Sequence, residues 1–442
     1  MTTLLEGLAE ICARPVPPAL RVRAARHLLD WLACAVAGAA SEPGRTVRGT
    51  LTSEGAVPLA GGGRADPRTA ALINGSLGNA LEMDDVHRTA ILHPGPVVVP
   101  AALSLAQDTD ALLDGIVRGY EAMIRVGQAV GPAHYAYFHN TATCGPFGSA
   151  AAAASVLGLE PTAAVHAMAN AGSTAGGLWQ MRHEDTHTKQ LHAGRAAEAG
   201  VTAALLAAKG FRGPASLLEG EQGFLAALCP DGDPGPITAR CDGWLIEDVS
   251  FKPWPACRHA HPAIDAALLL RAEAGTDRFD DIEVHAYADA LRFCDRPDPR
   301  TPAEARFSLQ HAVAVTLLRG APDLSAFEME AVNDPAVAAL RAGVRVHQDE
   351  RLTEAFPERY GTWIKADTPG GRTGGMFVDA PHALGDPDRP LTDDQLRAKA
   401  VMLMRAGGYG EGSAQALCDA TLAIGEGAPI DPWLAQVAAG PS

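Results

Sequence analysis

Several features that would assign a function at once are missing from this sequence. No run of about 18 uninterrupted apolar residues occurs, so no membrane-spanning helix is expected. The segment 1–18 has neither a basic region nor a small-residue cleavage site, which predicts no secretory signal. Basic residues are in the minority, with 36 Lys and Arg against 52 Asp and Glu. The resulting net charge of −16 argues against nucleic acid and anionic membranes as partners. We therefore expect a cytoplasmic protein.

Cysteine is present, but not in a cluster-binding pattern. The eight cysteines are scattered and no two form a C-x-x-C pair, which is typical of buried reduced thiols and gives no support for a zinc ribbon or an iron–sulfur cluster. A P-loop, a dinucleotide-binding G-x-G-x-x-G and a G-x-S-x-G elbow are also missing. Residues 183–187 do read H-E-x-x-H, but their polar flanks argue against a zinc-binding helix. We expect no metal and no organic cofactor.

The first half of the chain is rich in alanine with apolar residues at helical spacing. Alanine is the strongest helix former, so propensity and periodicity agree. Asp110 is the expected N-cap of one of these helices. Helices are predicted at 21–38, 67–82, 111–130, 148–157, 161–175 and 189–210.

The pattern changes after residue 243 and changes back near residue 392. Short β-prone segments alternate there with helical ones, which indicates an α+β unit. The sequence thus predicts a mainly α protein whose large helical domain uses both chain ends, 1–245 and 391–442, with a smaller α+β domain, 246–390, inserted between them. The predicted strands are 282–287, 344–348, 362–366 and 376–378, and the predicted helices of this unit are 262–273 and 302–318.

The first of four polar stretches follows the helix predicted at 67–82. Glu82, Asp84 and Asp85 come at its end, and His93 follows in a His-Pro-Gly-Pro turn. Carboxylates are unfavourable at a helix C-terminus. Three of them there favour a functional role over simple solvation of the helix end.

The second stretch, 138–148, precedes a predicted alanine-rich helix. It contains His139, Thr141 and Thr143. Backbone N–H groups at a helix N-terminus can bind a carboxylate, and polar side chains beside them can assist. Simple capping of the helix by one of the two threonines is the alternative interpretation.

The third stretch, 187–195, is basic. Lys189, His192 and Arg195 are expected to lie roughly one turn apart on one face of a predicted helix. A partly buried lysine near other cations can have a lowered pKa and act as a base. A solvated basic helix face is the alternative.

The fourth stretch, 252–265, delivers Arg258, His259 and His261 to the start of a helix. Histidines two residues apart are not a usual helical metal pair. Asp265 follows His261 by one turn, which leaves a metal open, but no clear third ligand is spaced to join them. A general acid/base role is favoured over metal binding. For either histidine, a hydrogen-bonded, half-buried imidazole is the alternative.

The four stretches in this order resemble the MmgE/PrpD family, whose members include 2-methylcitrate dehydratases, cis-aconitate decarboxylases and iminodisuccinate epimerases. The resemblance runs through nearly the whole chain. It is carried by NGSLGNALEMDDVH at 74–87, LHPG at 92–95, HNTATCGPFGSAAAAASVLGL at 139–159, TKQLHAGRAAEAGVTAALLAAKGFRGP at 188–214, LEGEQGF at 218–224, KPWPACRHAHPAIDA at 252–266, ARFSLQHAVAV at 305–315 and LTDDQLRAKA at 391–400.

The resemblance implies a homodimer of a helical domain with a smaller α+β lid, and an active site in the cleft between them. It also implies catalytic positions in this chain. They are Glu82, Asp85, His93, Lys189 and His261.

For the chemistry, we expect His93 or His261 to remove a proton alpha to a carboxylate of a small di- or tricarboxylate. Cationic side chains would hold the carboxylates and stabilise the enolate-like charge. The expected substrate-binding residues are Arg258, His139, Thr141, His192, Arg195 and His259.

Loss of a β-hydroxyl, a dehydratase reaction, ranks first among the possible outcomes. Epimerisation of an imino- or amino-dicarboxylate, decarboxylation of a cis-aconitate-like acid and a catalytically silent carboxylate-binding homologue are the alternatives. The decarboxylase branch has Asp at Glu82, Thr at Val86 and one residue fewer between Asp85 and His93, so these departures weaken the decarboxylase assignment.

Overall fold

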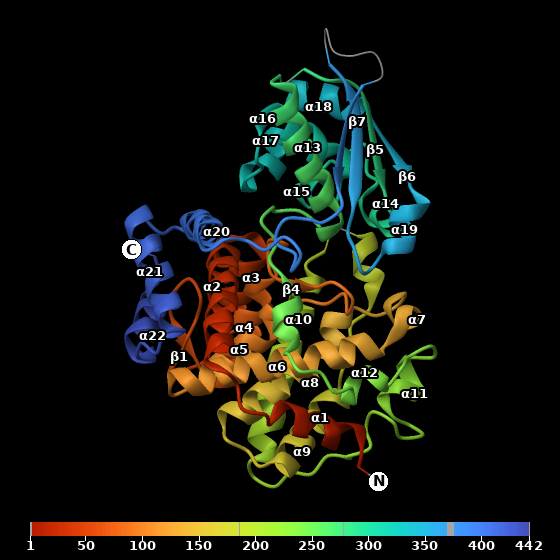
Figure 1. Ribbon diagram of the computed structural model, residues 1–442. Coiled ribbons are helices and arrows are strands. Elements are labelled where there is room, and N and C mark those ends of the chain that lie inside the picture. The colour runs from red at the N-terminus through yellow and green to blue at the C-terminus, as the bar shows by residue number, and fades with distance from the viewer. Residues whose placement is uncertain (1, 185, 277, 369–374, 442) are drawn as a thin grey trace. The chain divides into compact units, whose positions relative to one another are not determined.

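The computed structural model describes residues 2–184, 186–276, 278–368 and 375–441 (Figure 1). Internal contacts divide the chain into unit 1, Met1–Val249 with Thr392–Ser442, and unit 2, Ser250–Leu391. Most elements are helices and the strands are short, so the prediction of a mainly α protein is confirmed. Among the described residues, no helix combines the length and the apolar content needed to cross a bilayer.

Unit 1 is helical and is built from both ends of the chain. Its C-terminal helices return to pack against α2, beside which they are drawn in Figure 1. Its helices are α1 (Leu4–Cys12), α2 (Pro18–Ala40), α3 (Glu42–Thr50), α4 (Pro67–Gly78), α5 (Gly95–Leu103), α6 (Thr109–Ala129), α7 (Gly131–Tyr135), α8 (Asn140–Val156), α9 (Pro161–Gly172), α10 (Thr188–Ala207), α11 (Phe224–Leu228), α12 (Gly235–Thr238), α20 (Asp393–Ala406), α21 (Glu411–Ile424) and α22 (Ile430–Ala439).

Helix α10 packs against α4, α8 and α9, and small residues allow these helices to approach closely. One close crossing joins α4 to α10. A Cβ atom on Gly194 would lie 2.2 Å from the Oγ of Ser76 and 2.3 Å from the carbonyl oxygen of Leu72, closer than real Cβ atoms come. This crossing holds the first turn of α10 near the loop that follows α4.

Two helix starts in unit 1 differ from the prediction. Helix α6 is capped by the side chain of Asp108, which accepts from the Ala111 N–H, so the expected N-cap Asp110 lies inside the first turn. Helix α8 begins at Asn140, although a Gly-Pro pair within it reads as a helix breaker. The pair is tolerated because Gly145 packs directly against α10, where an added Cβ would lie 2.9 Å from that of Ala196.

Unit 2 is an α+β unit around one mixed sheet. Its four strands have the order β6-β5-β7-β8, with β5 and β6 parallel and the other pairs antiparallel. Helices α13 and α16 pack with the inward side chains of the sheet. The elements are α13 (His261–Ala274), β5 (Asp280–Ala286), α14 (Ala288–Cys294), α15 (Pro302–Arg306), α16 (Leu309–Arg319), α17 (Met329–Val332), α18 (Pro335–Ala342), β6 (Val344–Gln348), α19 (Glu350–Ala355), β7 (Thr362–Asp367) and β8 (Met376–Ala380).

The four predicted strands of unit 2 are all present, but the helix predicted at 302–318 is broken. Helix α15 ends at Arg306, and α16 begins at Leu309. The side chain of Ser308 caps α16 by accepting from the His311 N–H. Because serine competes well for backbone donors at helix starts, this local capping overrides the continuous apolar pattern.

Candidate active site

The loop after α4 carries the predicted acidic cluster. Helix α4 ends at Gly78, so the carboxylates lie beyond the helix and do not face its C-terminal dipole. Glu82 has a φ of 59°, a left-handed conformation that residues with a side chain rarely adopt. The amide of Asn79 donates to Asp84 Oδ2 at 2.7 Å. Backbone strain of this kind is found where surrounding contacts over-determine a functional geometry.

Glu82 and Lys189, two of the predicted catalytic residues, form an ion pair. Lys189 stands in the first turn of α10 and its Nζ donates to the Glu82 carboxylate. The two side chains are only 15% and 11% exposed. The pair is therefore screened from bulk water, where such an interaction is stronger than on a fully solvated surface.

His93 is held on three sides. Its Nδ1 lies 3.0 Å from Asp84 Oδ2 and 3.0 Å from the Asp85 carbonyl oxygen, and its backbone N–H donates to Thr141 Oγ1 at 3.0 Å. Both partners of Nδ1 are acceptors, so Nδ1 carries the proton and Nε2 is the basic nitrogen. A carboxylate that fixes an imidazole in one tautomer is the arrangement of a general base.

The sequence did not indicate that Asp84 is the carboxylate that contacts His93.

The predicted catalytic carboxylate next to it, Asp85, is buried and contacts three other groups. It accepts from His27 Nδ1 at 2.7 Å, from the Tyr120 hydroxyl at 2.6 Å and from the Gly95 N–H at 2.8 Å. Burial raises the pKa of Asp85 to about 6. These contacts tie the start of α5 to the core, and the catalytic role expected of Asp85 stays a prediction.

His139 and His192 lie beside this cluster. Their Nδ1 atoms are 3.4 Å apart, and the His139 ring centroid is 6.5 Å from that of His93. Burial, followed by the charge of Lys189, lowers the pKa of both imidazoles, and that of His139 falls well below its usual range. Both rings are therefore neutral at pH 7. The buried Nε2 of His139 has no hydrogen-bond partner among the described residues, so it is suited to bind a ligand.

Helix α8 starts at this cluster and supplies two further contacts. His139 is the residue before its first turn, and Thr141, whose hydroxyl positions His93, lies within that turn. The first N–H groups of any helix have no acceptor within the helix, so this end can bind an anion. Trp179, which had no predicted role, packs its ring 4.7 Å from that of His139.

Arg195 does not join the cluster. It pairs with Glu198 on α10 and its side chain is 65% exposed. The expectation of one shared face fails because an α-helix turns by about 100° per residue, so positions six apart point about 120° away from each other. Lys189 and His192 are partly buried while Arg195 faces outward.

The H-E-x-x-H match does not form a metal-binding helix. His183 ends the short 3-10 helix η1 (Trp179–His183), and His187 precedes α10, so the two do not share one helix. Both are exposed, and Asp185 between them lies outside the described residues. Within the described part of the chain, no group of three or more His, Cys, Asp or Glu side chains is placed to hold a metal ion.

In unit 2, Arg258 and His261 contact each other and their own unit. The Arg258 guanidinium forms a buried ion pair with Asp386 and donates to the Leu384 carbonyl at 3.3 Å. It also lies 3.2 Å from His261 Nδ1, while His261 Nε2 lies 3.1 Å from the Ala256 carbonyl. Arg258 thus contacts residues of unit 2, and its predicted role in substrate binding stays a prediction. The catalytic role of His261 stays a prediction.

His259 is part of an aromatic cluster in the core of unit 2. Its Nδ1 lies 2.6 Å from the Tyr287 hydroxyl, and its ring stacks on Phe293 with centroids 4.9 Å apart. Burial lowers the pKa of His259 to about 3, with a smaller effect of Arg258. The contacts of this neutral, packed ring support the half-buried imidazole interpretation over substrate binding.

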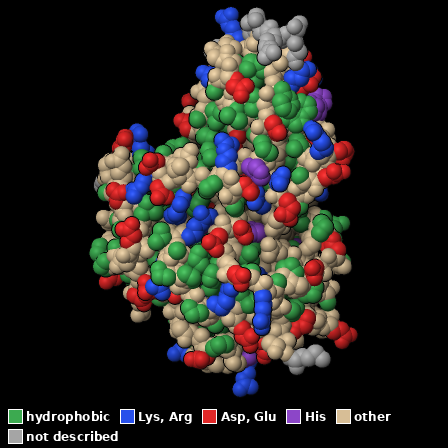
Figure 2. Space-filling view, viewed as in Figure 1, with side chains coloured by type: hydrophobic (Ala, Val, Ile, Leu, Met, Phe, Trp, Pro, Cys, Tyr) green, Lys and Arg blue, Asp and Glu red, His purple; other side chains and the backbone are tan. Residues whose placement is uncertain are grey.

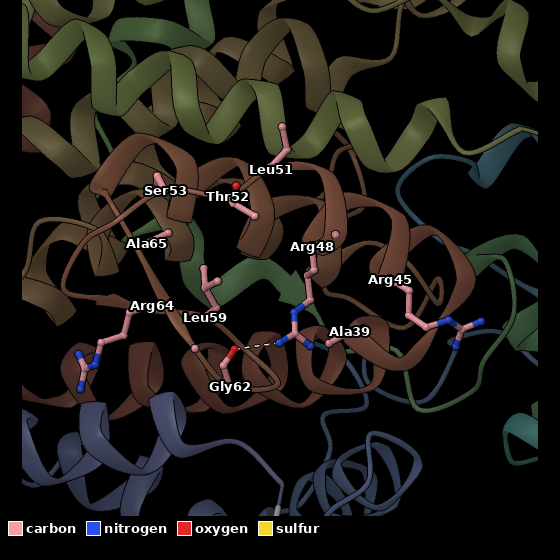
Figure 3. A pocket seen from close by; sticks show the side chains of 12 residues that line it. Ala39, Arg45, Arg48, Leu51, Thr52, Ser53, Leu59, Gly62, Arg64 and Ala65 are labelled. Carbon is pink, nitrogen blue, oxygen red and sulfur yellow. Dashed lines mark hydrogen bonds between the residues drawn. The ribbon is translucent and has the colours of Figure 1, made fainter.

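A separate pocket of about 490 Å³ lies on unit 1 between α3 and β2 (Arg64–Ala65). Arg48 lies in its centre and donates to the Gly62 carbonyl at 2.9 Å, whereas the guanidinium groups of Arg45 and Arg64 lie toward opposite ends (Figure 3). Its lining has no Asp, Glu or His. Since it offers no group that exchanges protons near pH 7, the cluster around His93 is the better candidate for catalysis.

Charge on the visible face gives no competing site. Acidic and basic side chains are interspersed there, with no single extended basic patch (Figure 2). An anionic ligand of this acidic protein therefore needs a local cationic group, and the partly buried Lys189, which is paired with Glu82, is the candidate in the cluster around His93.

The Asp84–His93 pair and the Lys189–Glu82 pair lie in segments covered by a family model. The MmgE/PrpD N-terminal domain matches residues 3–236, and the MmgE/PrpD C-terminal domain matches residues 254–424. The chain belongs to the MmgE/PrpD family.

Relatives in this family include enzymes with two different names. A human cis-aconitate decarboxylase is 32% identical over 308 residues, 64% of this chain and 62% of that protein. A cis-aconitate decarboxylase-like protein of Aspergillus oryzae is 27% identical over 433 residues, 90% of this chain and 88% of that protein. A 2-methylcitrate dehydratase of Salmonella typhimurium is 29% identical over 247 residues, 53% and 51% of the two chains. The chain thus spans less than two thirds of the human relative.

Proposed function

We propose that this protein is a lyase that dehydrates a small di- or tricarboxylate by proton transfer between side chains, without a metal or an organic cofactor. The main observation behind this proposal is that Asp84 pairs with His93 and Glu82 pairs with Lys189. Both carboxylates belong to the loop after α4, so this loop contacts two side chains that can exchange protons. Relatives named for dehydration of 2-methylcitrate and for decarboxylation of cis-aconitate support a lyase acting on acids of this size.

The proposed reaction begins at His93. Its Nε2 removes the proton alpha to a substrate carboxylate, and the electron pair of the C–H bond moves into an enolate-like carboxylate. The ammonium of Lys189 stabilises this charge. The enolate then forms the C=C bond as the C–O bond to the β-hydroxyl breaks. Lys189 donates a proton to the departing oxygen, so one water leaves, and the two side chains exchange protons with solvent before the next turnover.

Carboxylate recognition has two sources in unit 1. Lys189 provides a partly screened positive charge, and the first N–H groups of α8 provide neutral donors beside it. His139 Nε2 is a further buried polar atom at the same place. These two kinds of donor favour a substrate with more than one carboxylate, because one carboxylate can bind Lys189 while another binds the N–H groups of α8.

Decarboxylation is the second candidate, and the Aspergillus oryzae relative that aligns over 90% of this chain favours it. In that reaction the C–C bond to a carboxylate breaks, CO₂ leaves and the carbanion takes one proton. One proton donor is enough. The presence of two paired acid/base groups therefore favours dehydration, which needs a base and an acid.

Proton NMR of the purified, chelator-treated protein in D₂O separates these outcomes. The panel is 2-methylcitrate, citrate, cis-aconitate, tartrate-like acids and N-substituted aspartates. We expect an alkene product with loss of water from a β-hydroxy acid. Release of CO₂ from cis-aconitate would establish the decarboxylase instead, and deuterium uptake without net loss would establish an epimerase. Lack of any change across the panel would contradict the proposal.

One variant and one matched control test the site itself. His93→Asn removes the base, and general base catalysis is worth about 10²–10⁴-fold, so turnover falls by at least about 10²-fold. His166→Asn is the matched control, because His166 lies in α9 and contacts the Gly213 carbonyl. Activity that disappears with a chelator and returns with a metal ion would contradict the cofactor-free mechanism.

A further inference from the structure

A buried lysine from the C-terminal part of the chain reaches the acidic loop. Lys399 lies on α20 and is 5% exposed. Its Nζ donates to Asp30 Oδ1 on α2 and, at 2.6 Å, to the carbonyl oxygen of Met83. Met83 stands between Glu82 and Asp84, the two carboxylates that contact Lys189 and His93.

Stability alone does not account for this arrangement. A buried ion pair is often no more stabilising than two apolar side chains of similar size, because both charges lose their hydration. Lysine is among the residues least often fully buried. Here the Lys399 ammonium donates one hydrogen bond to the Met83 carbonyl oxygen. This carbonyl belongs to the loop in which Glu82 has a left-handed backbone conformation. This second contact of the ammonium fixes the position of that loop.

We propose that Lys399 is a positioning residue for the Asp84–His93 pair: it holds the Met83 carbonyl and thereby sets the direction of the neighbouring carboxylates. The proposal rests on the proposed function, in which His93 is the base. Lys399 itself contacts neither His93 nor Lys189 in any described hydrogen bond or ion pair, so it acts through the loop and not on the substrate.

The charges around Lys399 are consistent with a link to this pair. Burial alone would lower the pKa of Lys399, but the charge of Asp30, its hydrogen bond to Lys399 and the charge of Asp84 raise it overall. The ammonium is therefore charged at pH 7 and attracts Asp84, the partner of His93. Its own counter-charge, Asp30, comes from α2, against which α20 packs.

The test uses the double variant Asp30→Asn/Lys399→Met in the full-length protein. Replacing both partners leaves no uncompensated buried charge, so the protein is expected to keep its fold and thermal midpoint. The contact to Met83 is lost. Because small displacements of a catalytic group cost up to about 10²-fold, we expect kcat to fall about 10-fold or more with KM changed less than about 3-fold. Arg405→Met, an exposed position on the same helix paired with Glu411, is the control.

Two readouts separate positioning from a general loss of structure. The pH profile of kcat and the NMR titration of the His93 imidazole, assigned with His93→Asn, are expected to shift in the double variant and to stay unchanged in Arg405→Met. A folded double variant with wild-type kcat and an unchanged His93 titration would overturn the proposal. If the wild-type protein turns over no substrate, the proposed function fails, while the His93 titration still decides whether Lys399 acts on the pair.

Discussion

His93 Nδ1 and Asp84 Oδ2 lie 3.0 Å apart, and this contact selects one of two adjacent aspartates as the partner of the proposed base. The other, Asp85, turns its carboxylate into the core, where the Tyr120 hydroxyl donates to it at 2.6 Å. The two neighbours are both buried but have different partners. One orients an imidazole that retains 14% exposure, and the other closes a buried network.

Asp84→Asn is predicted to impair catalysis more than stability. The amide cannot accept from Nδ1 with the strength of a carboxylate, so the imidazole loses its fixed tautomer and its charge stabilisation. We expect kcat/KM to fall by about 10²–10⁴-fold, measured with the substrate found by NMR. Asp85→Asn is the comparison: its NH₂ group replaces one acceptor oxygen and faces either the Gly95 N–H or the His27 and Tyr120 donors, so unfolding free energy falls by about 1–3 kcal/mol per donor left unpaired. Equal effects of the two variants on kcat would contradict these separate roles.

Lys189→Met and Arg195→Met are predicted to differ sharply although both lie on α10. The first removes the partly buried ammonium beside Glu82, and we expect a loss of about 10²-fold or more in turnover, as for loss of one charge-stabilising group. The second removes an exposed side chain, and we expect turnover within about 2-fold of wild type, since exposed ion pairs contribute little. Circular dichroism checks that both keep their helices. A large loss in Arg195→Met would place it in the site.

The helical spacing of apolar residues predicted most of the helices, because the residues at this spacing are the ones that are buried. The sheet of unit 2 was also predictable, since its strands combine β-branched residues with turns between them. The predicted inserted domain, 246–390, can be compared with unit 2 at 250–391. The start of α8 was not predictable from local signals, because Gly145 and Pro146 are tolerated by packing against another helix.

Site residues were predictable by type but not by orientation. The sequence indicated the Glu82–Asp85 cluster and Lys189, which the structure joins through one ion pair. It could not decide between Asp84 and Asp85, because consecutive loop residues point in different directions that only the fold determines. It also gave no sign that Lys399, far along the chain, reaches the same loop.

His87 is predicted to make unit 1 sensitive to acid. Burial, with a smaller effect of Arg88, lowers the pKa of His87 to about 3 from 6.5. The unfolded chain therefore binds the proton more tightly between these values, so stability is present above pH 6.5 and is lost as pH falls toward 3. In His87→Gln, the slope of unfolding free energy against pH between 4 and 6 is expected to decrease by about 1.4 kcal/mol per pH unit.

Denaturant unfolding followed by tryptophan fluorescence at several pH values measures this slope. His183→Gln is the control, because His183 is exposed and its substitution leaves the buried His87 in place. An unchanged slope in His87→Gln would show that the imidazole does not carry this acid sensitivity.

The α4–α10 crossing yields the last prediction, Gly194→Ala. The added methyl group would lie 2.2 Å from Ser76 Oγ and 2.3 Å from the Leu72 carbonyl oxygen, so the two helices must separate. Overpacking of this kind costs about 1–3 kcal/mol of unfolding free energy. Turnover is expected to fall as well, because the same two helices carry Lys189 and the loop that holds Glu82.

Gly412→Ala separates this steric effect from the general effect of replacing a helical glycine. Gly412 lies in α21, and no other atom would come within 4 Å of its added Cβ. Alanine loses less backbone freedom on folding, so this variant is expected to gain about 0.5–1 kcal/mol and to keep full turnover. If Gly194→Ala also gained stability and kept its activity, close packing of α4 on α10 would not set the distance between Lys189 and Glu82.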